Sequence, residues 1–109
     1  MLELTPVQVA ALERLAARGF AIVAFPLYAS AIGVRRGLFA VLLVPVEDGS
    51  LRLLGDPCYL IDGNLSVRVT RKGRPTFVWK GRELEATPEL LTELERFAAE
   101  VSALLLPVV

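Results

Sequence analysis

The sequence contains no histidine, and this absence removes the base most often used in enzyme active sites. Serine and cysteine nucleophiles usually depend on a neighbouring imidazole, so nucleophilic catalysis is poorly supported. Zinc sites need several Cys or His ligands, and the chain has a single cysteine. We therefore predict no metal and no cofactor, and we favour a protein that is not an enzyme.

Cysteine is almost absent, because Cys58 is the only one. No disulfide can form within the chain, and such chains are typical of the cytosol, which is the compartment we predict. Cys58 follows Pro57 in a run typical of a strand, where we expect the thiol to serve as a small buried apolar group. Side-chain amides are scarce too, since Gln8 and Asn64 are the only two, which is typical of a heat-adapted protein.

The chain also has no apolar run long enough to span a membrane. The charge-free stretch 19–34 has sixteen residues and contains Pro26, whereas a membrane-spanning helix needs about 20 predominantly apolar residues. We therefore predict no membrane partner.

Net charge is zero, so no global field favours nucleic acid or an anionic surface. The charges are nevertheless segregated, because residues 63–82 carry six basic side chains and no acidic ones. Phe77 and Trp79 lie within this block, and basic strands with aromatic residues are typical of single-stranded nucleic-acid binders. We expect the block to be solvated or paired with the acidic helix near the C-terminus. Binding of nucleic acid, or of another anion, is the alternative, through Arg68, Arg71, Lys72, Arg74, Lys80 and Arg82.

Apolar residues are abundant, at 54% of the chain, above the about 45–50% of an ordinary domain. A length of 109 residues predicts a single domain, 1–109, and small domains bury a lower fraction of their surface than large ones. We expect more apolar surface than one copy can hide, and we predict a homodimer.

The run Leu38–Val46 consists of nine consecutive apolar residues. A half-exposed strand would alternate apolar and polar residues, so the run predicts a strand that is covered on both faces. Two arrangements are open. Both terminal helices lie on one face and a second subunit covers the other, or each helix covers one face.

Helix start signals occur near both ends of the chain. Thr5, Pro6 and Gln8 form a capping box with proline in the first turn, and Gly19 is a stop signal. Thr87 and Pro88 open a second helix in the same way, and an apolar stripe at helical spacing follows. The stripe consists of Leu90, Leu94, Phe97, Val101 and Leu104. We expect the apolar C-terminal segment 104–109 to pack on its own domain or on a partner subunit.

Turn signals recur every seven to ten residues between the helices, at 47–49, 55–57, 62–64, 72–75 and 80–82. Such spacing predicts an antiparallel meander. The fold class is therefore α+β, with a five- or six-stranded antiparallel sheet and one helix from each end packed on it. Pro26 marks 20–30 as an edge strand, a bulged strand or two short pieces.

Alternation of side chains predicts the register of the basic hairpin. A three-residue loop, 72–74, pairs Val69 with Phe77 and Val67 with Trp79, which places the aromatic residues with the valines on the core face.

No motif in the sequence identifies an activity. We predict a small non-enzymatic binding or interaction domain. The alternatives are nucleic-acid binding through the hairpin 68–82 and a ligand-binding or catalytic pocket between sheet and helix, lined by Tyr28, Tyr59 and Trp79.

Overall fold

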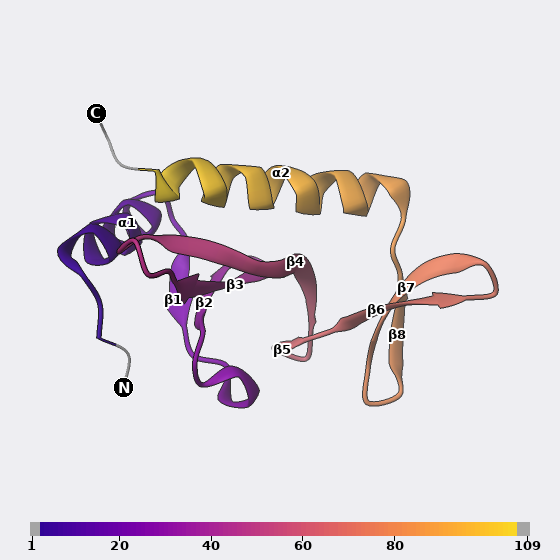
Figure 1. Cartoon of the computed structure of the whole chain (residues 1–109). Coiled ribbons are helices and arrows are strands. Elements are labelled where there is room, and N and C mark those ends of the chain that lie inside the picture. The colour runs from indigo at the N-terminus through magenta and orange to yellow at the C-terminus, as the bar shows by residue number, and fades with distance from the viewer. Residues whose placement is uncertain (1–2, 107–109) are drawn as a thin grey trace.

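The computed structural model describes residues 3–106 (Figure 1). Its helices and strands are, in order, α1 (Pro6–Ala17), β1 (Ala21–Val23), the 3₁₀ helix η1 (Pro26–Tyr28), β2 (Ile32–Arg36), β3 (Phe39–Pro45), β4 (Leu51–Ile61), β5 (Asn64–Leu65), β6 (Val67–Arg71), β7 (Arg74–Trp79), β8 (Arg82–Glu85) and α2 (Pro88–Leu105). The predicted α+β class is confirmed, with two terminal helices packed on an antiparallel five-stranded sheet.

The strands divide between two sheets, one in the order β1-β2-β3-β4-β5 and one in the order β6-β7-β8. The chain leaves the first sheet at Ser66, whose amide donates to the carbonyl of Tyr59 at 3.3 Å. Figure 1 shows α2 running along one side of the molecule from α1 to the second sheet. The molecule is therefore elongated, with extents of 46 × 28 × 23 Å.

Both helices pack on the same face of the five-stranded sheet. The shared core consists of Ala11 and Leu15 from α1, Phe97, Val101 and Leu105 from α2, and Phe20, Ile32, Val34, Val41, Leu43 and Leu51 from the sheet and its approach. Of the two predicted arrangements, the structure adopts the one with both helices on one side.

The other face of β3 is covered by the chain itself. Ala40 and Leu42 are buried there, in a cluster with Ala31, Leu60 and Leu65. The strand covered on both faces is thus confirmed, but the expectation that a second subunit covers its far side is wrong.

A bulge in β4 makes this covering possible. Leu54 pairs with Leu42 and Cys58 pairs with Ala40, so three residues of β4 lie opposite Val41 alone. Extra residues bend a strand and increase its twist. The bend carries the end of β4 and the short β5 across the far face of β3.

The helix caps predicted from the sequence are present. The Thr5 amide donates to Oε1 of Gln8 at 2.8 Å, and the Gln8 amide donates to Oγ1 of Thr5 at 3.1 Å. Both side chains also reach the β3–β4 turn. Thr5 Oγ1 donates to the carbonyl of Gly49 at 2.8 Å, and Gln8 Nε2 donates to that of Ser50 at 2.9 Å. The capping box therefore also ties α1 to the sheet.

The end of α2 is tied to α1. Arg14 donates from Nε to the carbonyl of Leu104 at 2.9 Å and from Nη2 to that of Leu106 at 3.1 Å. These carbonyls lack helical partners at a helix C-terminus, and a cation there is favourable. Of the predicted tail 104–109, Leu104 and Leu105 pack on their own domain, Leu106 is 67% exposed, and residues 107–109 lie outside the described residues.

The predicted three-residue loop in the basic hairpin is wrong. Arg71 pairs with Arg74, so the turn holds only Lys72 and Gly73. Both have positive φ, 51° and 77°, which is the backbone of a turn whose twist matches that of antiparallel strands.

The register shifts accordingly, and Phe77 pairs with Arg68 rather than with Val69. Phe77 is nevertheless buried, as expected, because its contacts come from outside the hairpin. It packs with Ile61, Ala86 and Leu94, and its ring stacks on Tyr59 with centroids 5.9 Å apart.

Candidate functional site

The 3₁₀ helix η1 projects apolar side chains into solvent. Pro26 begins it, since a first-turn residue needs no amide donor, and the Tyr28 amide donates to the carbonyl of Phe25 at 2.8 Å. Pro26 therefore splits the apolar run 20–30 into two short pieces, the edge strand β1 and η1. Leu27 is 76% exposed and Tyr28 is 42% exposed. This exposure is high for large apolar side chains in an ordered turn.

Phe25 anchors η1 to the sheet. Its ring lies against Gly33, where a Cβ atom would come within 2.5 Å of Cε2 of Phe25. The ring also packs on the buried cluster beyond β3. Only glycine allows so close an approach, so η1 is fixed on this face of the sheet.

The opposite side of the site is formed by β5 and the end of β7. Asp62 and Gly63, with φ of 52° and 78°, make a tight turn, and Asn64 Nδ2 donates to the carbonyl of Asp62 at 3.0 Å. Trp79 ends β7 and is partly exposed, with Nζ of Lys80 5.4 Å from its ring centroid. An amide and a cation thus border an aromatic ring.

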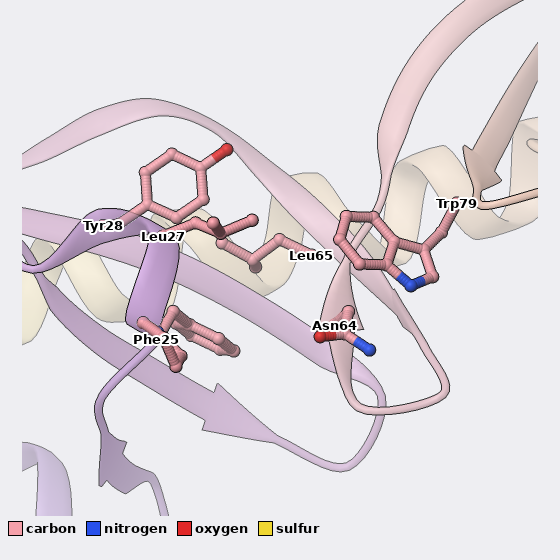
Figure 2. Close-up of a pocket in the computed structure, with 7 residues that line it drawn as sticks. Phe25, Leu27, Tyr28, Asn64, Leu65 and Trp79 are labelled. Carbon is pink, nitrogen blue, oxygen red and sulfur yellow. The ribbon is translucent and has the colours of Figure 1, made fainter.

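Between these elements lies a shallow hollow, open to solvent, which we call the Tyr28–Trp79 cleft (Figure 2). It is lined by Phe25, Pro26, Leu27, Tyr28, Asn64, Leu65 and Trp79. None of these residues is a carboxylic acid, a lysine or a cysteine, so the Tyr28 phenol is the one titratable group among the lining residues. Its enclosed volume is only about 30 Å³, far below the about 300–1,000 Å³ typical of small-molecule sites, so the cleft is a shallow surface depression.

The structure brings together two of the three residues predicted to line a pocket. Tyr28 and Trp79 share the cleft, whereas Tyr59 lies in another hollow with Arg82 and Leu84. The cleft lies between η1 and the β5–β7 region rather than between sheet and helix. The other five lining residues were not predicted, although the apolar run around Pro26 was a signal for those of η1 and its approach. They are Phe25, Pro26, Leu27, Asn64 and Leu65.

The basic block is largely paired with acidic groups. Four arginines each form an ion pair, and all of these side chains are well exposed. The pairs are Arg68–Asp56 at 3.6 Å, Arg71–Glu83 at 3.0 Å, Arg74–Glu85 at 3.1 Å and Arg82–Asp62 at 3.4 Å. Exposed pairs add little stability, but here they reduce the positive field of the hairpin.

The partners of these arginines differ from those expected. They come from β8, from the bulged part of β4 and from the β4–β5 turn, and not from the acidic residues of α2. Within residues 3–106, the ion pair that α2 makes joins Glu100 to Arg36 of β2. Lys72 occupies the β6–β7 turn, and Lys80 lies over Trp79.

Cys58 shows no sign of activation. Burial raises the pKa of its thiol, and the nearby Asp56 carboxylate raises it further, which opposes formation of a thiolate at neutral pH. The thiol donates to the carbonyl of Asp56 at 3.6 Å. Residues 3–106 hold no group of three or more acidic or cysteine side chains placed to share a metal ion. Neither helix, over the residues described, is long and apolar enough to cross a membrane.

Comparison with protein-family models, with curated proteins and with solved structures finds no match to this chain.

Proposed function

We propose that the protein is a small non-enzymatic interaction domain that binds an apolar side chain of a protein partner at the surface of the Tyr28–Trp79 cleft. The observation that carries this proposal is the 76% exposure of Leu27. This residue lies on the turn η1 and lines the cleft together with Tyr28 and Trp79. Scattered exposed leucines are ordinary, but an aliphatic and aromatic group around a hollow is typical of an interaction site.

The composition of the cleft resembles that of an energetic centre in a protein interface. Tyrosine and tryptophan are enriched among residues that dominate binding, and a polar rim excludes water around them. Asn64 and Lys80 supply such a rim here. When a partner's apolar side chain covers Leu27 and Trp79, apolar surface of the partner and of this protein is removed from water.

Other observations favour binding over catalysis and over nucleic-acid recognition. The cleft has no titratable acid or base among its lining residues except the Tyr28 phenol. The ion pairs of the basic hairpin give no support for a phosphate-binding surface.

The proposal includes a homodimer that works in the cytosol. The dimer is supported by apolar side chains that stay exposed away from the cleft, and the cytosol by the lone cysteine.

A peptide-display selection against the immobilised protein tests the proposed function. We expect enriched peptides that carry a large apolar residue, and calorimetry of one such peptide should show binding to the wild type. Since burying a leucine side chain contributes about 1.5–3 kcal/mol, Leu27→Ser should weaken binding by about tenfold or more.

Val7→Ser is the matched control, because Val7 is also exposed, at 47%, but lies on α1 away from the cleft. It should leave the affinity unchanged. Selection of no apolar motif, or equal loss of affinity in the two variants, would contradict the proposal.

A further inference from the structure

The Tyr28–Trp79 cleft presents hydrogen-bond donors beside its apolar lining. Within residues 3–106, neither the indole N–H of Trp79 nor the hydroxyl of Tyr28 bonds another group of the protein. The indole N–H is open to solvent, since the described residues hold no buried side-chain nitrogen without a partner, and Tyr28 is 42% exposed. Asn64 spends one N–H of Nδ2 on the carbonyl of Asp62, at 3.0 Å, and keeps the second. The cleft can therefore donate to a ligand at several points.

The shape of the cleft determines how a ligand contacts it. Figure 2 shows Tyr28 and Trp79 at opposite sides of the hollow, with the aliphatic side chains of Leu27 and Leu65 between them. Because the hollow is shallow, it covers a ligand along one face and does not enclose it. A single side chain gains little contact area there, so a ligand that binds well also needs contacts from its backbone.

A proline-rich segment in the polyproline II conformation has the properties that this cleft requires. Its backbone makes no internal hydrogen bonds, so its carbonyl groups are free to accept from the donors of the cleft. Proline fixes φ, and an already extended segment loses less conformational entropy on binding than a flexible one. Grooves that recognise such segments are lined by aromatic side chains. The donors and rings of the cleft thus match this class of ligand.

The charge at the border of the cleft is positive. Nζ of Lys80 lies 5.4 Å from the ring centroid of Trp79, and no ion pair joins Lys80 to an acid within the described part of the chain. The nearby Asp62 is already paired with Arg82 at 3.4 Å. On the other side, η1 lies in the charge-free stretch 19–34. Charge complementarity therefore favours a ligand with a carboxylate at the Trp79 end.

We propose that the partner presents its apolar side chain on a proline-rich polyproline II segment that also carries an acidic residue. The proposal rests on the proposed function and names the class of partner. The Trp79 indole and the Tyr28 hydroxyl donate to carbonyl groups of the segment, and prolines lie on the two rings. Lys80 pairs with the acidic residue.

Calorimetry with two synthetic peptides of equal length tests this proposal. One peptide has a leucine and a glutamate among prolines, and the other has alanine at every proline position. We expect the proline peptide to bind about tenfold more tightly or better, because it is already extended.

The outcomes separate this proposal from the proposed function. Equal affinity of the two peptides, or a display selection that enriches apolar peptides without proline, overturns the polyproline II segment and leaves the proposed function standing. A display selection that finds no apolar motif overturns both.

Variants that remove a donor but keep an aromatic ring test the backbone contacts. Trp79→Phe and Tyr28→Phe should each weaken binding of the proline peptide by about threefold or more. Tyr59→Phe is the matched control, because Tyr59 lies in another hollow, and it should leave the affinity unchanged. Thermal unfolding verifies that each variant is folded. Unchanged affinity in both cleft variants overturns the proposed carbonyl contacts.

The acidic residue of the ligand is tested separately. Lys80→Gln should weaken binding of the proline peptide by about threefold or more at low salt, and should not affect the same peptide with glutamine in place of glutamate. Lys72→Gln is the control, because Lys72 also has a positive φ, 51° against 43° for Lys80, but lies in the β6–β7 turn. Equal affinity of the Lys80→Gln variant and the wild type overturns the ion pair.

Discussion

Gly33 shows how one missing side chain positions the cleft. A Cβ atom at this position would lie 2.5 Å from Cε2 of Phe25 and 2.7 Å from the carbonyl oxygen of Val23. The ring can move, but the Val23 carbonyl belongs to the β1–β2 pair. The glycine is therefore required for contact between η1 and the sheet.

Gly33→Ala should destabilise the fold by about 1–3 kcal/mol, the usual cost of overpacking a buried site. Urea unfolding measures the change. Ser30→Ala, a change of an exposed residue nearby, should stay within about 0.5 kcal/mol of the wild type. Equal stability of Gly33→Ala and the wild type would show that Phe25 does not pack as described.

Arg36 and Glu100 form a bidentate pair, with Nη1–Oε2 at 2.8 Å and Nη2–Oε1 at 3.0 Å. The hydrogen bonds from Arg36 lower the pKa of Glu100 below its ordinary value. The guanidinium of Arg36 also lies over the Phe20 ring, 4.2 Å from the centroid. The pair thus clamps α2 to β2 at the surface.

The pH dependence of this pair has a definite sign. Because the pKa of Glu100 is lower in the folded than in the unfolded chain, its contribution is fully present above the unfolded value of about 4.3. It is lost as pH falls through the lower folded value. Melting temperatures of Glu100→Gln should therefore lie below those of the wild type at pH 7 and converge with them near pH 3. A constant gap at both values would contradict the pairing.

At the scale of elements, the N-terminus of α1 carries a second role. Gln8 is 2% exposed and both accepts from the Thr5 amide and donates to the carbonyl of Ser50. Its amide thus connects the helix cap to the β3–β4 turn, at the end of the central strand.

Gln8→Ala should cost about 1–3 kcal/mol of unfolding free energy, because it leaves the partly buried Thr5 amide and Ser50 carbonyl without this partner. Chemical denaturation measures this loss. Glu13→Ala, on the exposed side of the same helix, should change stability by less than about 0.5 kcal/mol. If the two variants have the same free energy of unfolding, the link between cap and turn does not contribute to stability.

Elements whose signals are local could be predicted from the sequence. Thr5 and Thr87 mark both helix starts, and the unbroken run Leu38–Val46 marks the central buried strand. The register of the basic hairpin was predicted wrongly, because alternation favours the three-residue loop that sets Val69 opposite Phe77, whereas the structure pairs Val69 with Thr76. The backbone of Lys72 and Gly73 and the packing of Phe77 on distant elements decide it.

The cleft was predictable only in part for a similar reason. Tyr28 and Trp79 are two of the few aromatic residues in the chain, but they are fifty-one positions apart. They meet because the bulge in β4 folds β5 across β3 and the second sheet follows it. A bend of this kind depends on tertiary packing, which leaves no periodic pattern in the sequence.

At the scale of the whole molecule, α2 holds the two sheets together. Its C-terminal half packs with Phe97 and Val101 on the five-stranded sheet, and Leu94 packs under the second sheet with Phe77. Within one copy of the chain, apolar residues cover both faces of β3. The apolar side chains that stay exposed include Leu27 and Tyr28 at the Tyr28–Trp79 cleft, and others are spread over α1, the strands and the turns.

Energy transfer from Trp79 to the apolar dye 8-anilinonaphthalene-1-sulfonate tests the central claim, an apolar binding site in the cleft. Trp79 is the only tryptophan, so all tryptophan emission comes from the cleft, and the two variants locate the bound dye. We predict that bound dye quenches Trp79 and emits on tryptophan excitation, and that Leu27→Ser weakens dye binding by about tenfold while Val7→Ser does not. Dye that fails to bind, or that binds equally well to both variants, would contradict the account.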